Sequence, residues 1–324
     1  MKAIVCHEFG PLEKLSYEDV DAPAAGAGNV VLDIKAAGVN YPDGLMVQGL
    51  YQMKPPFPFT PGSEVAGVIS EVGDGVSHVK AGDRVIGFVG VGGYAEKALC
   101  PATHLIPIPD GISDEEAAGL TTAHATAHHA LKQRANIQPG ETLLVTGAAG
   151  GTGLAAVQIG KAMGATVIAA CSSEEKLQLA KENGADILIN YKENDLKTEL
   201  KAINDGKGID VVYDTVGGDA FDASSRCMAW NGRLLIIGFA SGEIPKFPVN
   251  LALVKGYSVI GVFWGSFTAH QPKDFADNMR ELLGWYLQGK VKVVVDEALP
   301  LSDAKAALEK VMGRQVKGKM VLVP

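Results

Sequence analysis

A seven-residue segment near the middle of the chain has the composition of a phosphate-binding turn. It runs from Gly147 to Gly153 (GAAGGTG), after an apolar segment at 142–146 and before a helix-like segment at 154–163. Glycine lets the backbone approach a pyrophosphate closely, and a helix N-terminus offers N–H groups and a positive dipole end to its charge. Such a turn can also simply pack a helix against a strand. The order strand, glycine turn, helix favours a dinucleotide site, which we expect to include Ala149, Gly150, Gly151, Thr152 and Gly153.

Small hydroxyl side chains stand where an NAD-binding fold usually has an acid. That acid follows the glycine turn by about 20 residues and holds the ribose 2′-hydroxyl; here the position is Ser173, with Ser172 before it and Lys176 after it. A carboxylate would repel the 2′-phosphate of NADPH, whereas serine and lysine can bind it. NADH stays open as the alternative cofactor. If the ribose-binding position lies one or two residues after Ser173, Glu174 or Glu175 becomes the acid that holds the ribose hydroxyl. Ser172 and Glu175 have capping-box spacing, which would engage Glu175 with its own helix. We favour NADPH.

The elements that must position these residues alternate in the βα order of a parallel sheet. A helix is expected at 115–131, and six apolar strand segments follow at 142–146, 166–170, 186–190, 211–214, 233–237 and 258–263. Six strands in this rhythm predict a doubly wound Rossmann sheet. Three aromatic residues then stand at carboxyl ends of strands, where such folds bind ligands: Phe239 after the fifth strand, and Phe263 and Trp264 after the sixth. These side chains are equally suited to the core.

The N-terminal part has a different pattern. Short β-like segments at 3–6, 30–36, 64–72 and 83–89 are separated by Gly and Pro, which predicts a mostly β domain. Helices are expected at 272–287 and 302–311, and a closing strand at 319–323. The sequence thus predicts an α/β protein with a β domain, 1–120, completed by 266–324, and a nucleotide-binding domain, 121–265.

Composition excludes several classes of function. The formal net charge is −8, with 47% hydrophobic and 20% charged residues, so no broad basic surface is available for nucleic acid. No stretch approaches the roughly 18 apolar residues of a membrane span, and we expect a cytoplasmic protein. Four separate cysteines show no metal-ligand spacing. His124, His128 and His129 lack the HExxH pattern, and we interpret them as solvated or hydrogen-bonded histidines rather than metal ligands.

The segment 140–161, GETLLVTGAAGGTGLAAVQIGK, closely resembles the signature of quinone oxidoreductases and ζ-crystallin. This is the zinc-free branch of the medium-chain dehydrogenase/reductase superfamily. Further resemblances cover nearly the whole chain: GVNYPD at 38–43, PGSE at 61–64 with Gly67, VKAGDRV at 79–85, GGYAE at 92–96, and the pair Asn190-Tyr191. The resemblance implies a GroES-like catalytic domain, a Rossmann domain and an active site in the cleft between them.

The same resemblance assigns roles to individual residues. Zinc-dependent alcohol dehydrogenases have a cysteine where this chain has Asn40 and a histidine where it has Ser63, so we expect no zinc. We interpret the carboxylates of Asp43 and Glu64 as structural, paired with Arg84 or with a backbone amide. Family positions that match Ser173, Lys176 and Tyr191 contact the 2′-phosphate or the adenosine, and we add Gly238 to the candidate cofactor residues.

The expected chemistry is hydride transfer from NADPH to a quinone or an α,β-unsaturated carbonyl compound. Asn40 and Tyr51 are candidates to hydrogen-bond the acceptor oxygen, and Thr126 to orient the carboxamide or the substrate, since the matching family positions line that side of the cleft. Tyr51 could equally pack on the proline-rich loop. The alternatives are an acyl-CoA-type enoyl reductase and a cofactor-binding, crystallin-like protein with little turnover. Relatives pair an edge strand, so a homodimer through 258–263 is expected.

Overall fold

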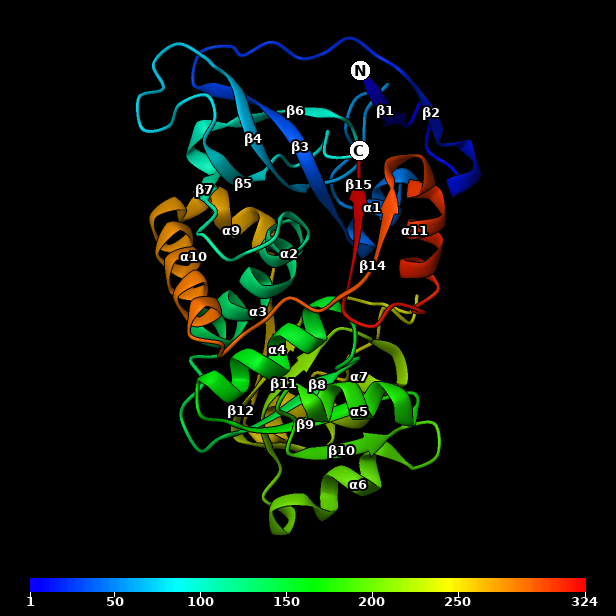
Figure 1. Cartoon of the computed structure of the whole chain (residues 1–324). Coiled ribbons are helices and arrows are strands. Elements are labelled where there is room, and N and C mark those ends of the chain that lie inside the picture. Colours follow the sequence, from blue (N-terminus) through cyan, green and yellow to red (C-terminus); the bar gives the residue numbers. More distant parts are fainter. The chain divides into compact units, whose positions relative to one another are not determined.

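The computed structural model describes residues 1–324, apart from the side chain of Asn204, and the chain forms two units (Figure 1). The first comprises Met1–Thr122 and Val293–Pro324, and the second comprises Ala123–Lys292. The predicted return of the chain to the first unit at residue 266 is therefore wrong for residues 266–292. These residues belong to the second unit because α10 (Pro272–Leu287) binds helix α3 (Thr126–His129) and the turn after it. Glu281 of α10 accepts hydrogen bonds from His128 and Lys132. Asn278 of α10 is hydrogen-bonded to Gln133.

A seven-stranded sheet forms most of the first unit. Its strand order is β14-β15-β3-β4-β5-β7, with β6 also paired to β3. The bounds are β3 (Asn29–Val39), β4 (Glu64–Val72), β5 (Arg84–Phe88), β6 (Lys97–Pro101), β7 (Leu105–Pro107), β14 (Val295–Pro300) and β15 (Lys319–Val323). Strand β3 is buried along most of its length because it pairs with β4 on one side and with β6 and β15 on the other. The predicted segments 30–36, 64–72 and 319–323 lie on these strands, and the predicted segment 83–89 is longer than β5 by one residue at each end.

The remaining elements of this unit surround the sheet. A separate hairpin pairs β1 (Lys2–Val5) with β2 (Ser16–Asp19). The helices are α1 (Tyr41–Val47), α2 (Asp114–Leu120) and α11 (Ala304–Met312), with 3₁₀ turns at Leu12–Lys14, Ala102–His104 and Leu301–Asp303. Helix α11 packs beside β14 and β15 (Figure 1).

The expected helix at 115–131 is interrupted. Ser113 and Glu116 form a capping box that starts α2, as their spacing allows. Two π-helical segments, Thr121–Ala125 and Ala130–Arg134, then flank α3. Such segments leave the regular ladder of helical bonds and are frequent at functional sites. The division between the two units falls inside the first of them.

The second unit is the predicted doubly wound sheet. Six parallel strands lie in the order β10-β9-β8-β11-β12-β13. Their bounds are β8 (Thr142–Thr146), β9 (Thr166–Cys171), β10 (Ile187–Asn190), β11 (Ile209–Asp214), β12 (Met228–Ile236) and β13 (Ser258–Gly261). All residues of β8 are buried because helices cover a parallel sheet on both faces. This order reverses direction between β8 and β11, and doubly wound folds bind their ligands at such a switch point.

Helices and turns connect these strands. They are α4 (Gly151–Ala162), α5 (Glu174–Glu182), α6 (Leu196–Ala202), α7 (Gly218–Ser225), α8 (Asn250–Lys255) and α9 (Trp264–His270), with a 3₁₀ turn at Ile203–Gly206. None of the described helices combines the length and apolar character that a bilayer-spanning segment needs.

Candidate functional site

The glycine turn leaves β8 and enters α4 by a path that two glycines make possible. Gly147 has φ +63°, and a Cβ there would lie 2.6 Å from Thr215 Oγ1. A Cβ on Gly153 would lie 2.2 Å from the carbonyl oxygen of Gly147. Gly150 has an ordinary φ of −78° and room for a Cβ, at 3.5 Å from its nearest neighbour. The turn therefore needs glycine at 147 and 153 for its own geometry and leaves Gly150 open to a ligand's approach.

The first-turn amides of α4 are the groups that can hold a pyrophosphate. Leu154 donates the first intrahelical bond, to the carbonyl of Gly150, so the amides of Gly151, Thr152 and Gly153 precede it. The Thr152 hydroxyl, in contrast, is engaged within the protein: it lies 2.5 Å from the Tyr213 hydroxyl and 3.2 Å from the carbonyl of Ala123. Thr152 thus offers its backbone rather than its side chain.

The thiol of Cys171 lies under the same turn. Burial raises its pKa to about 11, although hydrogen bonds from the backbone amides of Ala149 and Ala148 oppose that rise. The predicted contact of Ala149 with the cofactor stays a prediction.

The polar residues that support the turn from the neighbouring strand were not predicted from the sequence. Asp214 Oδ1 accepts from the Thr146 hydroxyl at 2.6 Å, and the Thr215 hydroxyl donates to the Thr146 carbonyl at 2.8 Å. Asp214 also accepts from the amides of Val216 and Gly217. Burial raises the pKa of Asp214, opposed by these bonds. The signal available was the glycine pair 217–218 directly after an apolar strand.

The end of β9 leads into α5 through Ser173. Its side chain accepts from the amide of Lys176 at 3.4 Å, which makes Ser173 the N-cap residue. The predicted capping box between Ser172 and Glu175 is therefore wrong by one position, because the helix begins at Glu174. Ser173 and Lys176 lie within one turn of each other, and their binding of one phosphate stays a prediction.

The other predicted cofactor residues lie at carboxyl ends of the same sheet. The amide of Tyr191 donates to the carbonyl of Cys171 at 3.1 Å, which places Tyr191 beside the end of β9. The amide of Gly238 bonds the Asp214 carbonyl, and Phe239 follows it. Phe263 is half exposed, whereas Trp264 is buried against Phe275 of α10 with ring centroids 5.8 Å apart. Trp264 thus belongs to the core, and the predicted contact of Phe263 with the cofactor stays a prediction.

In the first unit, Asn40 stands at the N-terminus of α1 and at the centre of a buried polar cluster. Its side-chain nitrogen donates to Glu64 Oε1 at 2.8 Å, and its side-chain oxygen accepts from Lys319 Nζ at 2.7 Å. Lys319 Nζ also donates to Glu64 Oε1 at 2.7 Å, and the Thr122 amide donates to Glu64 Oε2 at 2.6 Å. Arg84, the cation we expected here, instead binds Asp114 and the Ile112 carbonyl.

Asp43 forms the second carboxylate of this cluster. Its Oδ2 accepts from the backbone amide of Asn40 at 2.9 Å and from the Tyr94 hydroxyl at 2.7 Å. Burial raises the pKa of Asp43 to about 6, against the opposing effect of these two bonds. Burial, with Asp43 beside it, also raises the pKa of Tyr94 well above 10, so Tyr94 stays a hydrogen-bond donor. The predicted backbone-amide partner of each carboxylate is thus present.

The two remaining predicted catalytic residues lie in different units. Tyr51 is half-buried against the core of the first unit, and burial raises the pKa of its phenol. Thr126 begins α3 in the second unit. Both keep their predicted roles as proposals.

The three histidines are buried and hydrogen-bonded, not solvated. His124 bonds the Lys292 carbonyl, His128 bonds Glu281, and His129 bonds Gln133. Burial lowers the pKa of His128 to about 4. Within the described part of the chain, no group of three His, Cys, Asp or Glu side chains is arranged to hold a metal ion.

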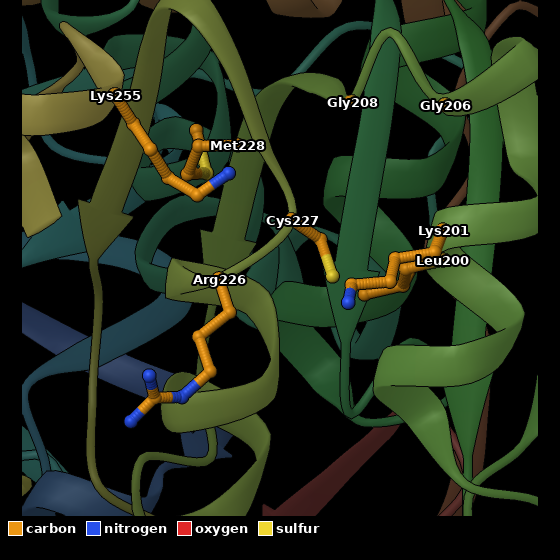
Figure 2. Close-up of a pocket in the computed structure, with 8 residues that line it drawn as sticks. All are labelled: Leu200, Lys201, Gly206, Gly208, Arg226, Cys227, Met228 and Lys255. Atoms are coloured by element: carbon orange, nitrogen blue, oxygen red, sulfur yellow. The ribbon is translucent and has the colours of Figure 1, made fainter.

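A pocket of about 320 Å³ lies at the other end of the nucleotide-binding sheet. Gly208 and Met228, at the amino ends of β11 and β12, line it together with Lys201, Arg226 and Cys227. In Figure 2, Lys201 extends toward the Cys227 sulfur and Arg226 extends away from it. The glycine turn follows the carboxyl end of β8, so this pocket is no part of the nucleotide site.

Comparisons with known proteins agree with this geometry. A model described as "Alcohol dehydrogenase GroES-like domain" matches residues 26–110, and one described as "Zinc-binding dehydrogenase" matches residues 151–284. The quinone oxidoreductase-like protein 2 homolog of Nematostella vectensis is 39% identical over 99% of this chain and 88% of that protein. The quinone oxidoreductase of Rattus norvegicus is 37% identical over 100% and 98%.

A solved structure gives the same result. The Escherichia coli quinone oxidoreductase, crystallised in complex with NADPH, superposes with a TM-score of 0.94 at 34% identity, with 100% of each chain covered. Together with the doubly wound sheet, these similarities confirm the predicted fold class and the resemblance. The chain is an oxidoreductase that belongs to the zinc-free quinone oxidoreductase family of the medium-chain dehydrogenase/reductase superfamily.

Proposed function

We propose that the protein uses NADPH to reduce a quinone or an α,β-unsaturated carbonyl compound, without zinc. The choice of NADPH rests on the residues that follow β9. Ser173 and Lys176 share one helical turn there. The acid nearest to Ser173, Glu174, accepts a hydrogen bond from the Asn190 side chain at 2.9 Å. A cation and a hydroxyl suit a 2′-phosphate, and an engaged carboxylate is poorly suited to a ribose hydroxyl.

The residues present fit a dinucleotide. Gly150 has space for the close approach of a pyrophosphate, and the amides of Gly151, Thr152 and Gly153 point along the N-terminus of α4. When bound, NADPH supplies a hydride for the acceptor. The protein's part is to hold the acceptor, exclude water and donate hydrogen bonds to the oxygen on which negative charge develops, a role that we assign to Asn40 and Tyr51. Thr126 orients the carboxamide or the substrate.

The test is steady-state oxidation of NADPH and NADH with a panel of quinones, enones and an enoyl-CoA. We expect turnover with quinones or simple enones and a clear preference for NADPH. Turnover confined to the enoyl-CoA would assign the protein to the acyl-CoA-type enoyl reductases. Tight NADPH binding without turnover of any acceptor would assign it to the crystallin-like, cofactor-binding class.

We also propose a homodimer formed through the edge strand β13. Four apolar side chains beside it on the chain are 71–83% exposed, namely Ile244, Val249, Leu253 and Val254. An open strand edge next to exposed apolar side chains is typical of a protein interface. The double variant Leu253→Glu/Val254→Glu should be monomeric by light scattering, while Leu287→Glu, at an exposed leucine on α10, should keep the oligomeric state. A monomeric wild-type protein would contradict the proposal.

The cytoplasm remains the predicted location.

A further inference from the structure

Lys319 is a buried cation that joins the last strand of the chain to the proposed acceptor site. Its side chain is 4% exposed and that of Glu64 is fully buried. The Lys319 ammonium donates at 2.7 Å to Asn40 Oδ1, at 2.7 Å to Glu64 Oε1 and at 3.4 Å to the carbonyl of Val39. All three protons of the ammonium therefore have acceptors, which is the condition for burying such a group.

These contacts fix which way the side-chain amide of Asn40 faces. An ammonium only donates hydrogen bonds and an ionised carboxylate only accepts them. Oδ1 of Asn40 must therefore face Lys319, and Nδ2 must face Glu64. The reversed amide would place an NH₂ group against the ammonium and a carbonyl oxygen against the carboxylate, so one orientation of the two is strongly preferred.

The backbone of Asn40 is held independently. Its amide donates to Asp43 Oδ2 at 2.9 Å, and its residue precedes the first turn of α1. Backbone and side chain are thus both anchored, by different carboxylates. Of the two N–H groups on Nδ2, one is directed to Glu64 and the second remains for another acceptor.

We propose that Lys319, together with Glu64, is a positioning residue that holds the Asn40 amide with its second N–H toward the substrate oxygen. This inference rests on the proposed function, in which Asn40 donates to the acceptor. A buried ion pair is a costly way to gain stability alone, because apolar residues of similar size often replace one without loss. Its effect here is to make Asn40 a donor of defined direction.

The experiment compares Lys319→Met with the double variant Lys319→Met/Glu64→Gln. The single change leaves the Glu64 carboxylate buried without its cation and should lower the melting temperature. The double change removes both charges, and the oxygen of the new glutamine side chain can still accept from the Thr122 amide, so most of the melting temperature should return. An amide at position 64 can donate as well as accept, so it no longer dictates which end of Asn40 faces it.

Turnover should separate positioning from stability. We expect kcat/KM for the acceptor to fall about 10- to 100-fold in both variants, since a misplaced oxyanion-type donor can cost up to roughly 1000-fold. The dissociation constant for NADPH, measured by fluorescence titration, should change less than about twofold. Lys319→Arg, which keeps a donating cation, should retain more turnover than Lys319→Met.

Two results would overturn the inference, and they differ in what else they remove. If the double variant regains wild-type turnover together with its stability, Lys319 only balances a buried charge, and the proposed function stands. If wild-type protein reduces none of the acceptors with NADPH, the proposed function and this inference fail together.

Discussion

The side-chain amide of Asn190, at the end of β10, donates a 2.9 Å hydrogen bond to the carboxylate of Glu174, the first residue of α5. This bond joins the end of the third strand of the βα order to the helix that follows the second strand, at the point where we expect a dinucleotide's ribose to lie. It engages the acid that stood closest to Ser173 in the sequence. We therefore propose that selectivity between the two nicotinamide cofactors depends on Ser173 and Lys176.

Lys176→Ala should weaken NADPH binding about 10- to 150-fold, the equivalent of roughly 1.5–3 kcal/mol for a charge-assisted hydrogen bond, and leave NADH nearly unaffected. Ser173→Asp should shift preference toward NADH, since a carboxylate repels the 2′-phosphate and also caps a helix well. Both changes should be non-additive because they act on one phosphate.

Titration of each variant with both cofactors measures these effects, and Lys181→Ala, in the last turn of α5, is the matched control for lost charge. Equal losses for NADPH and NADH in Lys176→Ala would contradict the assignment and return Glu174 to consideration.

Asn40→Ala and Tyr51→Phe should lower turnover more than they change NADPH affinity. A lost oxyanion donor costs about 2.7–4 kcal/mol, or ~100- to 1000-fold in rate, where the donor acts mainly in the transition state. The measurement is kcat/KM for the acceptor beside the NADPH dissociation constant. Unchanged turnover in both variants would place the acceptor site elsewhere.

The purified protein should contain no stoichiometric zinc. Asn40 and Ser63 replace the thiolate and imidazole of the zinc-dependent relatives, and the Asn40 side chain is already bonded to Glu64 and Lys319. Elemental analysis after dialysis should find well under one zinc per chain. One tightly held zinc, removed together with activity by a chelator, would be inconsistent with this prediction.

Asp43→Asn should flatten the pH dependence of stability between pH 4 and pH 7. Burial raises the pKa of Asp43 to about 6 from its ordinary value of 3.8, so the folded state binds more protons than the unfolded state between these values. Stability from this group is thus greatest below pH 4 and declines as pH rises through 6, by up to about 3 kcal/mol. The asparagine oxygen can still accept from Tyr94 and Asn40.

Urea unfolding of wild type and Asp43→Asn at pH 4.5, 6 and 7.5 measures this. The variant should be close to wild type at the lowest pH and more stable at the highest. Parallel curves at all three pH values would show that Asp43 keeps an ordinary pKa.

Gly153→Ala should destabilise the nucleotide-binding unit without cofactor, whereas Gly150→Ala should not. The new methyl at 153 meets the Gly147 carbonyl at 2.2 Å, and overpacking typically costs about 1–3 kcal/mol. At 150 the methyl meets its nearest neighbour at 3.5 Å. Thermal unfolding of both variants without cofactor is the measurement. Equal melting temperatures would mean that the turn relaxes freely.

The sequence predicts the nucleotide-binding sheet well because its strands are continuous apolar runs. Strands such as β2 and β14 were not predicted, since they alternate between half-buried and exposed residues and lie outside the main core. The N-cap of α5 was misplaced because Ser172 and Ser173 are both good caps, and only the backbone path selects between them.

For the buried cluster around Asn40, the sequence predicts most of the residues but few of their contacts. Asp43 and Glu64 were predicted as structural carboxylates, but with Arg84 as their partner. Nothing in the sequence points to Lys319 as their partner, because it lies 255 positions from Glu64 along the chain. Only the pairing of β15 with β3 brings the ammonium to the carboxylate.

That pairing has a consequence for how the protein is made. Val39 of β3 pairs with Met320 of β15, which lies 281 residues further along the chain. At about 5–20 residues per second, a ribosome takes roughly 14–56 s to synthesise that interval. Throughout it, an apolar strand edge of the nascent chain lacks its partner strand and the Glu64 carboxylate lacks its cation. The second unit, whose residues are contiguous, is complete before the first unit receives its last strands, β14 and β15.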